Sequence, residues 1–213
     1  MLWENLGEIP SLPVALILQG ADVKINNVKK LTDYKYLNLF SVNYKDRAKC
    51  DKQWTFASRS KRLDPLAKKN TNPDAVVIVP FHVQEQKLVV IKEFRISLGG
   101  YHYGFPAGLL DKNESIETAG KRELYEETGL SITKILKKSP AVFSSSGMTD
   151  ESVSLLFVEC NGEPTNRFNE ASEDIEVKML SKKNAADLLS DNKIKFDVKS
   201  WIVLNTFASY GVI

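Results

Sequence analysis

The 213-residue sequence predicts an α+β fold, and three observations lead to this class. Apolar residues make up 43% and charged residues 26% of the chain, which is typical of a globular domain that buries a core. Short β-branched segments recur between residues 36 and 180, and helical patterns interrupt them. Strands and helices mixed in this order are typical of α+β folds or of a sheet sandwiched between helices.

The N-terminal region, residues 1–70, predicts short strands separated by polar breaks. Residues 36–44 alternate apolar and polar side chains, and residues 54–58 predict the second strand of a hairpin. The basic segment 58–74 contains two prolines and predicts a linker or surface loop. We therefore expect a β-rich N-terminal segment over 1–70 and a second domain over 71–213. Since the first segment is too short and polar to bury a core alone, we expect it to pair two subunits.

The second domain predicts strands and helices in a mixed order. Apolar strands are predicted at 75–81, 87–94, 141–146, 153–160 and 175–180, and an extended segment at 101–108. A helix is predicted between Ser115, a good N-cap, and Gly129, a good C-cap. Two more helices are predicted at 181–192, with Ser181 as N-cap, and at 197–211, ended by Gly211.

Charge and cysteine content exclude several functional classes. The formal net charge of +2 gives no general drive toward nucleic acid or an anionic membrane. Cys50 and Cys160 are not in a C-x-x-C spacing, which argues against a zinc site or a disulfide framework. No basic leader precedes the first apolar stretch, and no run approaches the roughly 20 apolar residues of a membrane span. A cytoplasmic protein is the expectation.

Three carboxylates gather on one stripe of the predicted helix, namely Glu123, Glu126 and Glu127. Glu123 and Glu127 are spaced i,i+4, so their like charges destabilise the helix. Arg122 precedes Glu126 by four residues and can hold it in position. A solvated acidic face is the alternative, but these acids lack matching i,i+4 lysines. A hard cation such as Mg²⁺, which takes carboxylate oxygens, relieves the repulsion.

This stretch resembles the Nudix box, a pattern of glycines, glutamates and one arginine at fixed spacing. The residues that fill its defined places are Gly108, Glu114, Arg122, Glu123, Leu124, Glu126, Glu127, Gly129 and Leu130. The resemblance implies an α/β/α sandwich that hydrolyses nucleoside diphosphates linked to another moiety. It implies that Glu123 and Glu127 ligate Mg²⁺, for which Mn²⁺ is a substitute. It further implies that Glu126 is a ligand or orients one, that Arg122 steadies the glutamates, and that Gly108 forms a tight turn.

Residues outside the box resemble the ADP-ribose and ADP-sugar pyrophosphatase branch. Residues 105–111, FPAGLLD, are similar to the segment that precedes the box in this branch, which implies that the Ala107 carbonyl ligates metal and that Leu109 contacts substrate. Residues 92–95, KEFR, end in Arg95. The resemblance implies that Arg95 contacts the diphosphate. Residues 145–151 are similar to a glycine-centred loop beside the substrate, which implies a substrate contact at Gly147.

The resemblance also implies substrate contacts in the N-terminal segment and a general base near residue 173. Trp54 and Tyr36 are the expected stacking rings for adenine, with cross-strand packing as the alternative. Arg59 is the expected ribose or phosphate contact, with a plain linker charge as the alternative. Glu173 aligns best with the general base, and its neighbours Glu170 and Glu176 are rivals.

The resemblance as a whole implies an Mg²⁺-dependent hydrolase that acts on ADP-ribose or a related ADP-sugar. A metal-activated water attacks one phosphorus, and AMP and a sugar phosphate leave. The expected assembly is a homodimer with exchanged N-terminal segments, and the expected partner is the nucleotide-sugar substrate rather than nucleic acid or membrane. Two alternatives stay open. One is a Nudix pyrophosphatase for a GDP-sugar, a dinucleoside polyphosphate, NADH or an oxidised nucleotide; the other is a non-catalytic module that binds ADP-ribose.

Overall fold

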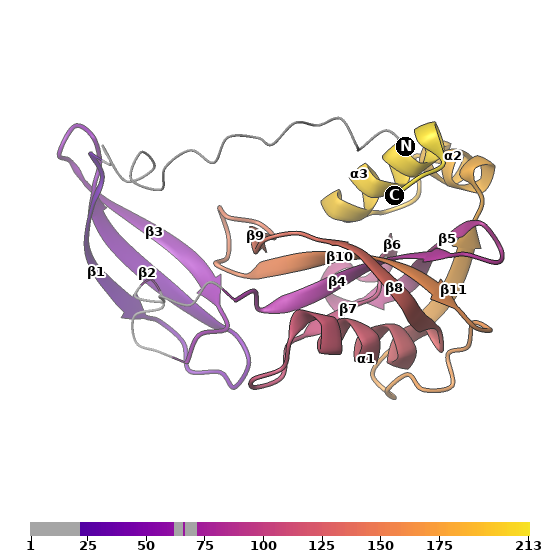
Figure 1. Cartoon of the computed structure of the whole chain (residues 1–213). Coiled ribbons are helices and arrows are strands. Elements are labelled where there is room, and N and C mark those ends of the chain that lie inside the picture. The colour runs from indigo at the N-terminus through magenta and orange to yellow at the C-terminus, as the bar shows by residue number, and fades with distance from the viewer. Residues whose placement is uncertain (1–21, 62–65, 67–71) are drawn as a thin grey trace. The chain divides into compact units, whose positions relative to one another are not determined.

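The computed structural model describes residues 22–61, 66 and 72–213, and these residues fall into two compact units (Figure 1). The first unit holds the described residues up to 66 together with Gly147–Asp150. The second unit holds residues 72–146 and 151–213. The chain thus leaves the second unit for four residues and then returns to it.

The first unit is built on an antiparallel sheet in the order β1-β2-β3. Its strands are β1 (Lys24–Lys30), β2 (Asn38–Lys45) and β3 (Asp51–Ser58). The register places Val42 opposite Trp54, which confirms the hairpin predicted from residues 36–44 and 54–58. Phe40 and Phe56 are buried and stack with ring centroids 5.7 Å apart, so aromatic packing holds β2 to β3.

The second unit contains a mixed sheet of eight strands among the described residues. In chain order these are β4 (Ala75–His82), β5 (Lys87–Arg95), β6 (Gly100–Gly104), β7 (Ala107–Leu109), β8 (Ser131–Lys138), β9 (Val142–Phe143), β10 (Ser152–Asn161) and β11 (Ile175–Leu180). The main path runs β11-β5-β4-β10-β8, while β6 pairs with β5, β7 with β4 and β9 with β10. The central pair, β4 and β10, is parallel, and the other pairs are antiparallel.

Three α-helices lie in the described part of the second unit: α1 (Ile116–Thr128), α2 (Lys182–Ser190) and α3 (Val198–Tyr210). A short 3₁₀ helix, η3 (Ile96–Leu98), follows β5. The N-caps predicted at Ser115 and Ser181 are confirmed, because each side chain accepts a hydrogen bond from a backbone N–H in the first turn. Gly129 and Gly211 end α1 and α3 with positive φ angles of 72° and 73°, as the sequence predicted.

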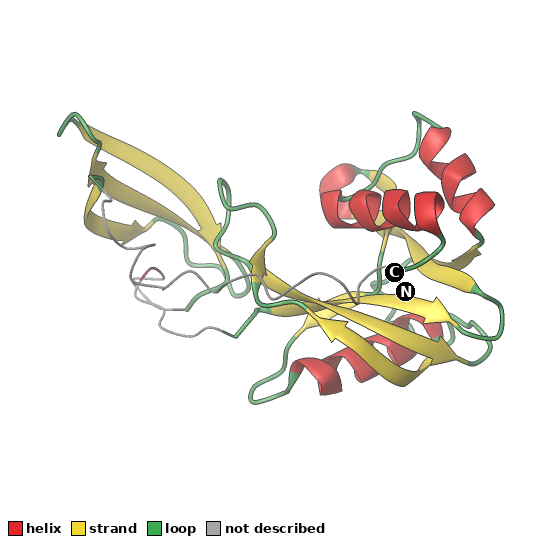
Figure 2. Ribbon diagram, turned by 45° about the horizontal axis from the view of Figure 1, so that its top comes forward, coloured by secondary structure: helices red, strands yellow, loops and turns green. Residues whose placement is uncertain are grey.

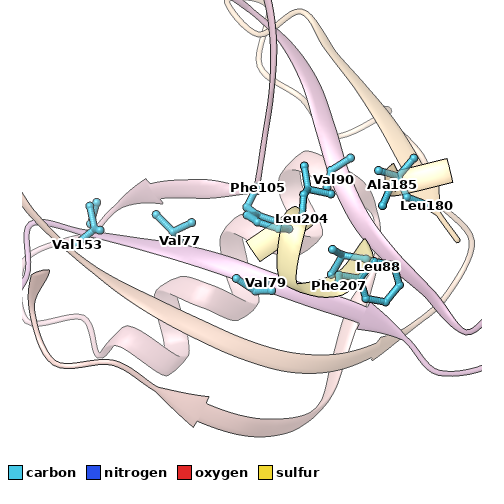
Figure 3. Packing of buried hydrophobic residues seen from close by; sticks show 11 residues of the cluster. Val77, Val79, Leu88, Val90, Phe105, Val153, Leu180, Ala185, Leu204 and Phe207 are labelled. Carbon is cyan, nitrogen blue, oxygen red and sulfur yellow. The ribbon is translucent and has the colours of Figure 1, made fainter. Parts of the chain in front are cut away.

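The sheet of the second unit is covered on both faces (Figure 2). Helix α1 packs on one face over a cluster that includes Val76, Ile78, Val89 and Leu156. Helices α2 and α3 cover the other face over a second cluster, which Figure 3 shows around Leu204 and Phe207. The strands therefore bury both faces between helices, and the predicted α/β/α sandwich is confirmed.

Helix α1 approaches the sheet closely at Gly120. A Cβ atom built there would lie 2.5 Å from Cδ2 of the buried Leu156 on β10. Only a residue without a side chain brings the helix this near the strand without displacing Leu156. The glycine therefore sets the distance between α1 and β10.

Two segments differ from their prediction. Residues 131–138 form strand β8, which the sequence did not reveal because most of its side chains are exposed and alternation is weak. This strand lies at the end of the main strand order, where its pairing partner is β10. The strand predicted over 141–146 is wrong beyond its first half, since β9 covers Val142–Phe143 alone. In the described ranges, no helix combines the length and apolarity needed to cross a bilayer.

Candidate functional site

Helix α1 sets three glutamates at different depths in the second unit. Glu127 is buried, Glu123 is largely buried, and Glu126 is about half exposed. Their spacing places them on one side of the helix, with Glu123 and Glu127 one turn apart. The helix therefore carries an acidic stripe that runs from the interior toward solvent.

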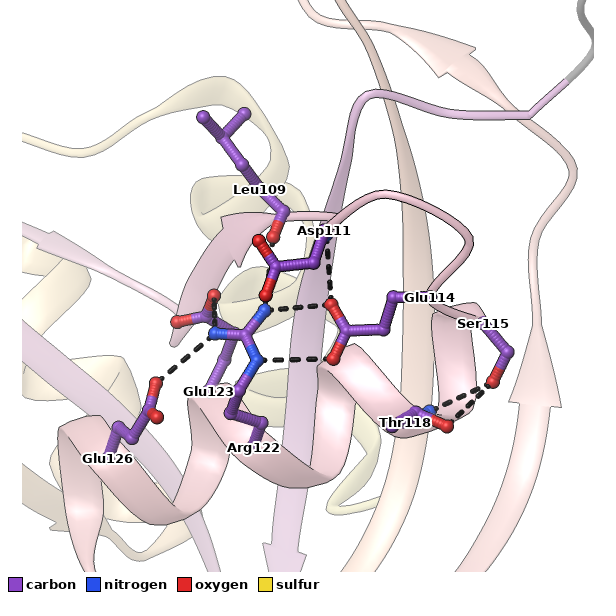
Figure 4. A network of polar contacts seen from close by, with 8 residues as sticks. All are labelled: Leu109, Asp111, Glu114, Ser115, Thr118, Arg122, Glu123 and Glu126. Atoms are coloured by element: carbon purple, nitrogen blue, oxygen red, sulfur yellow. Dashed lines mark hydrogen bonds and ion pairs between the residues drawn. The ribbon is translucent and has the colours of Figure 1, made fainter.

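Arg122 binds this acidic stripe to the loop before the helix (Figure 4). Its Nε and Nη2 atoms donate to the two carboxylate oxygens of Glu114 at 3.1 and 2.9 Å, in a bidentate pair. Its Nη1 donates to Glu123 at 2.6 Å and to Glu126 at 3.2 Å. Its Nη2 also donates to the Leu109 carbonyl at 3.1 Å. One guanidinium thus fixes the loop, strand β7 and two glutamates together.

Glu114 is the partner that sequence reasoning did not count among the site residues. It filled a place in the box pattern, but no local spacing showed that it faces Arg122. Hydrogen bonds from Arg122 and from the Asp111 N–H lower the pKa of Glu114, so it stays ionised. The same contact with Glu114 raises the pKa of Arg122 above its ordinary value.

Strand β7 provides the backbone against which the buried glutamates lie. The Ala107 N–H donates to Oε2 of Glu127 at 3.2 Å. A Cβ atom at Gly108 would lie 1.8 Å from Oε1 of Glu123, so only glycine leaves room for that carboxylate. Gly108 lies inside a strand paired with β4, and its φ is not in the left-handed region. The expectation of a tight turn at Gly108 is therefore wrong, and its function is close approach.

Burial and repulsion dominate the electrostatics of Glu127. Burial raises the pKa of its carboxyl well above the ordinary value. The negative charges of Glu123, Glu93 and Glu173 raise it further. The hydrogen bond from the Ala107 N–H opposes these effects. The folded protein therefore holds the proton of Glu127 more tightly than an exposed glutamate would.

Glu123 experiences the same conflict in weaker form. Burial is the largest influence and raises the pKa of Glu123. The hydrogen bond and positive charge of Arg122 lower this pKa, whereas the charges of Glu126 and Glu173 raise it. Two adjacent carboxyls with raised pKa values form a site whose ionised state lacks enough positive charge.

This donor set fits a divalent cation. Carboxylate oxygens are the ligands that hard cations prefer, and a bound cation offsets the burial and repulsion described above. In the described ranges, no group of three or more His, Cys, Asp and Glu side chains already converges in metal-binding geometry. Arg122 instead holds Glu123 and Glu126 in salt bridges. The side chains are of the right kind and number, and Glu123 and Glu127 are the buried pair among them.

Arg95 ends strand β5 and is tied to a carboxylate that sequence reasoning missed. Its Nη2 atom lies 3.0 Å from Oε2 of Glu93, while about half of the Arg95 side chain is exposed. Glu93 is buried and lies across the β5–β6 pair from His102, whose Nε2 is 3.5 Å from the same oxygen. Because the charge of Glu93 raises the pKa of Glu127, β5 and α1 contribute to one acidic centre, which consists of Glu93, Glu123, Glu126 and Glu127.

Glu173 approaches this centre from the loop between β10 and β11. Its charge raises the pKa of both Glu123 and Glu127, so the three carboxylates interact electrostatically. Its Oε2 atom accepts a hydrogen bond from the Glu170 N–H at 2.9 Å. Glu176 is placed differently, because it forms salt bridges with Lys178 and Lys92 that lower its pKa.

The remaining predicted residues lie in the first unit. Trp54 is about half exposed, and its Nε1 donates to the Gly147 carbonyl at 3.2 Å. The structure thus brings together two of the predicted substrate contacts, although they are 93 residues apart in the sequence. The Tyr36 ring is 69% exposed, with Lys35 Nζ 4.6 Å from its centroid, so Tyr36 is not a core residue. Arg59 follows β3 and is exposed.

Comparisons with known proteins identify the family of this chain. A family model described as the NUDIX domain matches residues 71–202. The chain is 34% identical over 147 residues to an ADP-ribose pyrophosphatase of Saccharomyces cerevisiae, an alignment that covers 64% of this chain and 58% of the yeast protein. It is 32% identical over 156 residues to a putative nudix hydrolase 2 of Caenorhabditis elegans, covering 68% of each chain.

A solved structure has the same fold. A crystal structure of an ADP compounds hydrolase superposes with a TM-score of 0.65, covering 88% of this chain and 94% of that chain at 21% identity. The match of the family model extends over more than half of the chain and includes α1 and all residues of the acidic centre. The chain belongs to the Nudix family.

Proposed function

We propose that this protein hydrolyses the diphosphate bond of ADP-ribose or a related ADP-sugar and releases AMP and a sugar phosphate. The observation that supports this most is the buried pair Glu123 and Glu127, which repel each other against strand β7. The similarity to a yeast protein named ADP-ribose pyrophosphatase supports the substrate class. We propose Mg²⁺ as the cation, with Mn²⁺ as a substitute.

The cation would be held by Glu123 and Glu127, with Glu126 and the Ala107 carbonyl as further ligands. When bound, a divalent cation stabilises the charge that builds up on diphosphate oxygens. Arg122 is the positioning residue of this set, because its guanidinium contacts Glu123 and Glu126 directly. Its bidentate pair with Glu114 keeps the guanidinium in place.

Arg95 binds the diphosphate in this proposal. Its guanidinium is anchored on one side by the buried Glu93, which limits the orientations it samples. A half-exposed, oriented guanidinium can donate two parallel hydrogen bonds to phosphate oxygens. Leu109 is the last residue of β7, the strand that carries Ala107, and its half-exposed side chain is proposed to border the substrate.

Glu173 is proposed as the general base. It accepts a proton from the attacking water as the new P–O bond forms, while the bridging P–O bond breaks and its electron pair leaves with the departing phosphate. Its electrostatic contact with Glu123 and Glu127 supports this choice. Glu176 is less suited, because two lysines already neutralise it. Glu170 remains the rival, since its backbone N–H bonds to Glu173.

The first unit is proposed to recognise the adenine. Trp54 and Tyr36 present exposed rings, which suit base stacking. Gly147 is proposed to border the substrate because its carbonyl fixes the Trp54 indole, and Arg59 is proposed to contact ribose or phosphate. We also propose a cytoplasmic homodimer formed through residues 1–70. Analytical ultracentrifugation should then give about twice the 23.9 kDa chain mass.

The decisive experiment incubates the protein with ADP-ribose and Mg²⁺, with and without EDTA, and separates the products by chromatography. We expect metal-dependent formation of AMP and ribose 5-phosphate. Glu173→Gln should lower kcat by about 10²- to 10⁴-fold, as expected for a general base. Cleavage of GDP-mannose, NADH or a diadenosine polyphosphate in place of ADP-ribose would assign the protein to that substrate class instead. Binding of ADP-ribose without cleavage of any of them would favour a non-catalytic module.

A further inference from the structure

The loop between β10 and β11, residues 162–174, contacts helix α1 near its start and in its middle, and it contacts the sheet at its end, next to Glu173. Near its start, the Thr165 N–H donates to the Thr128 carbonyl of α1 at 2.8 Å. In its middle, the Phe168 ring stacks on Tyr125 of α1, with centroids 4.7 Å apart and an interplanar angle of 24°. Exposed loops usually make few contacts of this kind, so the number of contacts in this loop indicates that its position matters.

The end of the loop is bonded to the sheet. The Tyr101 hydroxyl donates to Oδ2 of Asp174 at 2.5 Å, and the Phe94 N–H donates to the Asp174 carbonyl at 3.1 Å. Tyr101 itself is fixed on β6, because its ring packs edge-on against Phe94 at 5.3 Å and lies 4.6 Å from the Lys92 ammonium. The hydrogen bond to a carboxylate raises the pKa of Tyr101, so the phenol keeps the proton that it donates.

These attachments lie next to acidic residues of the site. Tyr125 precedes Glu126 on α1, Phe94 follows Glu93 on β5, and Asp174 follows Glu173. Because adjacent Cα atoms are about 3.8 Å apart, fixing Asp174 to the sheet restricts Glu173 directly. The loop is therefore located relative to the same helix and strand that carry the other groups of the site.

We propose that Tyr101 and Tyr125 are positioning residues for Glu173, holding the loop so that its carboxylate stays at the acidic centre. This inference rests on the proposed function, in which Glu173 is the general base. Tyr101 acts through its hydroxyl on Asp174, and Tyr125 acts through its stack with Phe168. A base displaced by about 1 Å from its productive place loses on the order of 100-fold in rate, so such attachments have a measurable effect.

Tyr101→Phe is the sharpest test, because it removes the hydroxyl and keeps the ring between Phe94 and Lys92. With ADP-ribose and Mg²⁺, we expect kcat to fall about 5-fold or more and KM to stay within about 2-fold, since the base does not bind substrate. Hydrogen–deuterium exchange of residues 162–174 should become at least about 3-fold faster. The matched control is Tyr210→Phe at the exposed end of α3, which should change neither quantity.

The stack is tested with two substitutions of Tyr125. Tyr125→Ala should lower kcat and speed exchange in the loop, whereas Tyr125→Phe keeps an aromatic ring on Phe168 and should restore both. Each change is repeated in a Glu173→Gln background. If the tyrosines act by placing Glu173, they should have no further effect on the residual kcat once that carboxylate is gone.

Three outcomes would overturn the inference. Unchanged kcat and exchange in Tyr101→Phe would show that the hydroxyl does not hold the loop. An equal fall of kcat in the Glu173→Gln background would show a general structural effect. If the unaltered protein cleaves none of the substrates, the proposed function fails and the catalytic part of this inference fails with it. The exchange measurement still decides separately whether Tyr101 and Tyr125 hold the loop.

Discussion

A single carboxylate determines which residue position 108 accepts. The Glu123 side chain occupies the space that a Cβ atom at Gly108 would need, at 1.8 Å from Oε1. Backbone and carboxylate are both held, the first by pairing with β4 and the second by Arg122. Moving the backbone would break its pairing with β4, and moving the carboxylate would break its salt bridge with Arg122. The glycine is therefore required by the glutamate rather than by the path of the chain.

Gly108→Ala should accordingly displace Glu123 and weaken the cation site. We expect Mg²⁺ to bind about 10- to 100-fold more weakly, as for changes to groups that orient metal ligands, measured by isothermal titration calorimetry. Gly100→Ala is the control on the neighbouring strand β6, where the nearest atom to a new Cβ is 3.5 Å away. Equal Mg²⁺ affinity in both variants would contradict the close-approach argument.

Glu127 should make the metal-free protein less stable as the pH rises. Its folded pKa is raised by burial first, so the folded state binds the proton more tightly than the unfolded state does. The cost of ionising it is absent below the unfolded pKa of about 4.3, grows as the pH rises toward the folded pKa and is constant above it.

Glu127→Gln removes this cost. In EDTA at pH 8, its Tm should exceed that of the unaltered protein by about 3 °C or more, which is roughly 1 kcal/mol for a domain of this size. The difference should shrink as the pH falls toward the unfolded pKa, where the cost of ionisation disappears, and differential scanning calorimetry checks both points. A Tm difference that is independent of pH would refute the electrostatic explanation.

Contacts between residues close in the sequence could be predicted, whereas contacts between distant residues could not. The acidic stripe and Arg122 are close in sequence on one helix, so spacing alone predicted that they meet. The sequence did not predict Glu93 as a site residue, because its contact with His102 depends on the register of β5 and β6. The Trp54–Gly147 hydrogen bond spans 93 residues, and no local pattern could predict it. The resemblance to the Nudix family implied that both residues contact substrate, but only the structure shows that they contact each other.

Among the elements, helix α1 is the one whose placement matters most for the site. Its N-cap at Ser115 and its end at Gly129 fix its length, and Gly120 fixes its distance from β10. These signals were readable from the sequence because caps and glycines act locally. Strand β8 was not readable, since an exposed edge strand has no buried face to impose alternation.

Gly120→Val should separate α1 from the sheet. The new side chain meets Leu156, which is fully buried, so overpacking should lower the stability by about 1–3 kcal/mol, or Tm by several degrees, in a thermal melt. Lys121→Val places the same side chain on the exposed side of the helix, where it meets no buried strand, and should lower Tm by less. Helix propensity cannot cause the loss, because valine is a better helix former than glycine. If both variants melt alike, overpacking against Leu156 is not the cause.

For the molecule as a whole, the proposal divides recognition and chemistry between the two units. Trp54→Ala should therefore raise KM for ADP-ribose about 10-fold or more, because stacking on an aromatic ring contributes roughly 1–3 kcal/mol. kcat and Mg²⁺ affinity should stay within about 3-fold, since the acidic centre lies in the second unit. Trp54→Phe keeps a ring and should preserve most of the affinity. An unchanged KM in Trp54→Ala would exclude Trp54 from base recognition.

The contacts of residues Gly147–Asp150 with the first unit constrain how the N-terminal sheet can be exchanged in evolution. The Met148 carbonyl accepts from the Ala57 N–H at 2.8 Å, and Asp150 accepts from the Ser58 hydroxyl at 2.9 Å. The segment therefore supplies partners to strand β3, although Ser58 and Asp150 are 92 residues apart in the sequence. A recombination event at residue 70 alone would deprive β3 of both partners. Lineages that exchanged the N-terminal sheet should carry matching changes at 147–150, and a working chimera between relatives should transfer both stretches together.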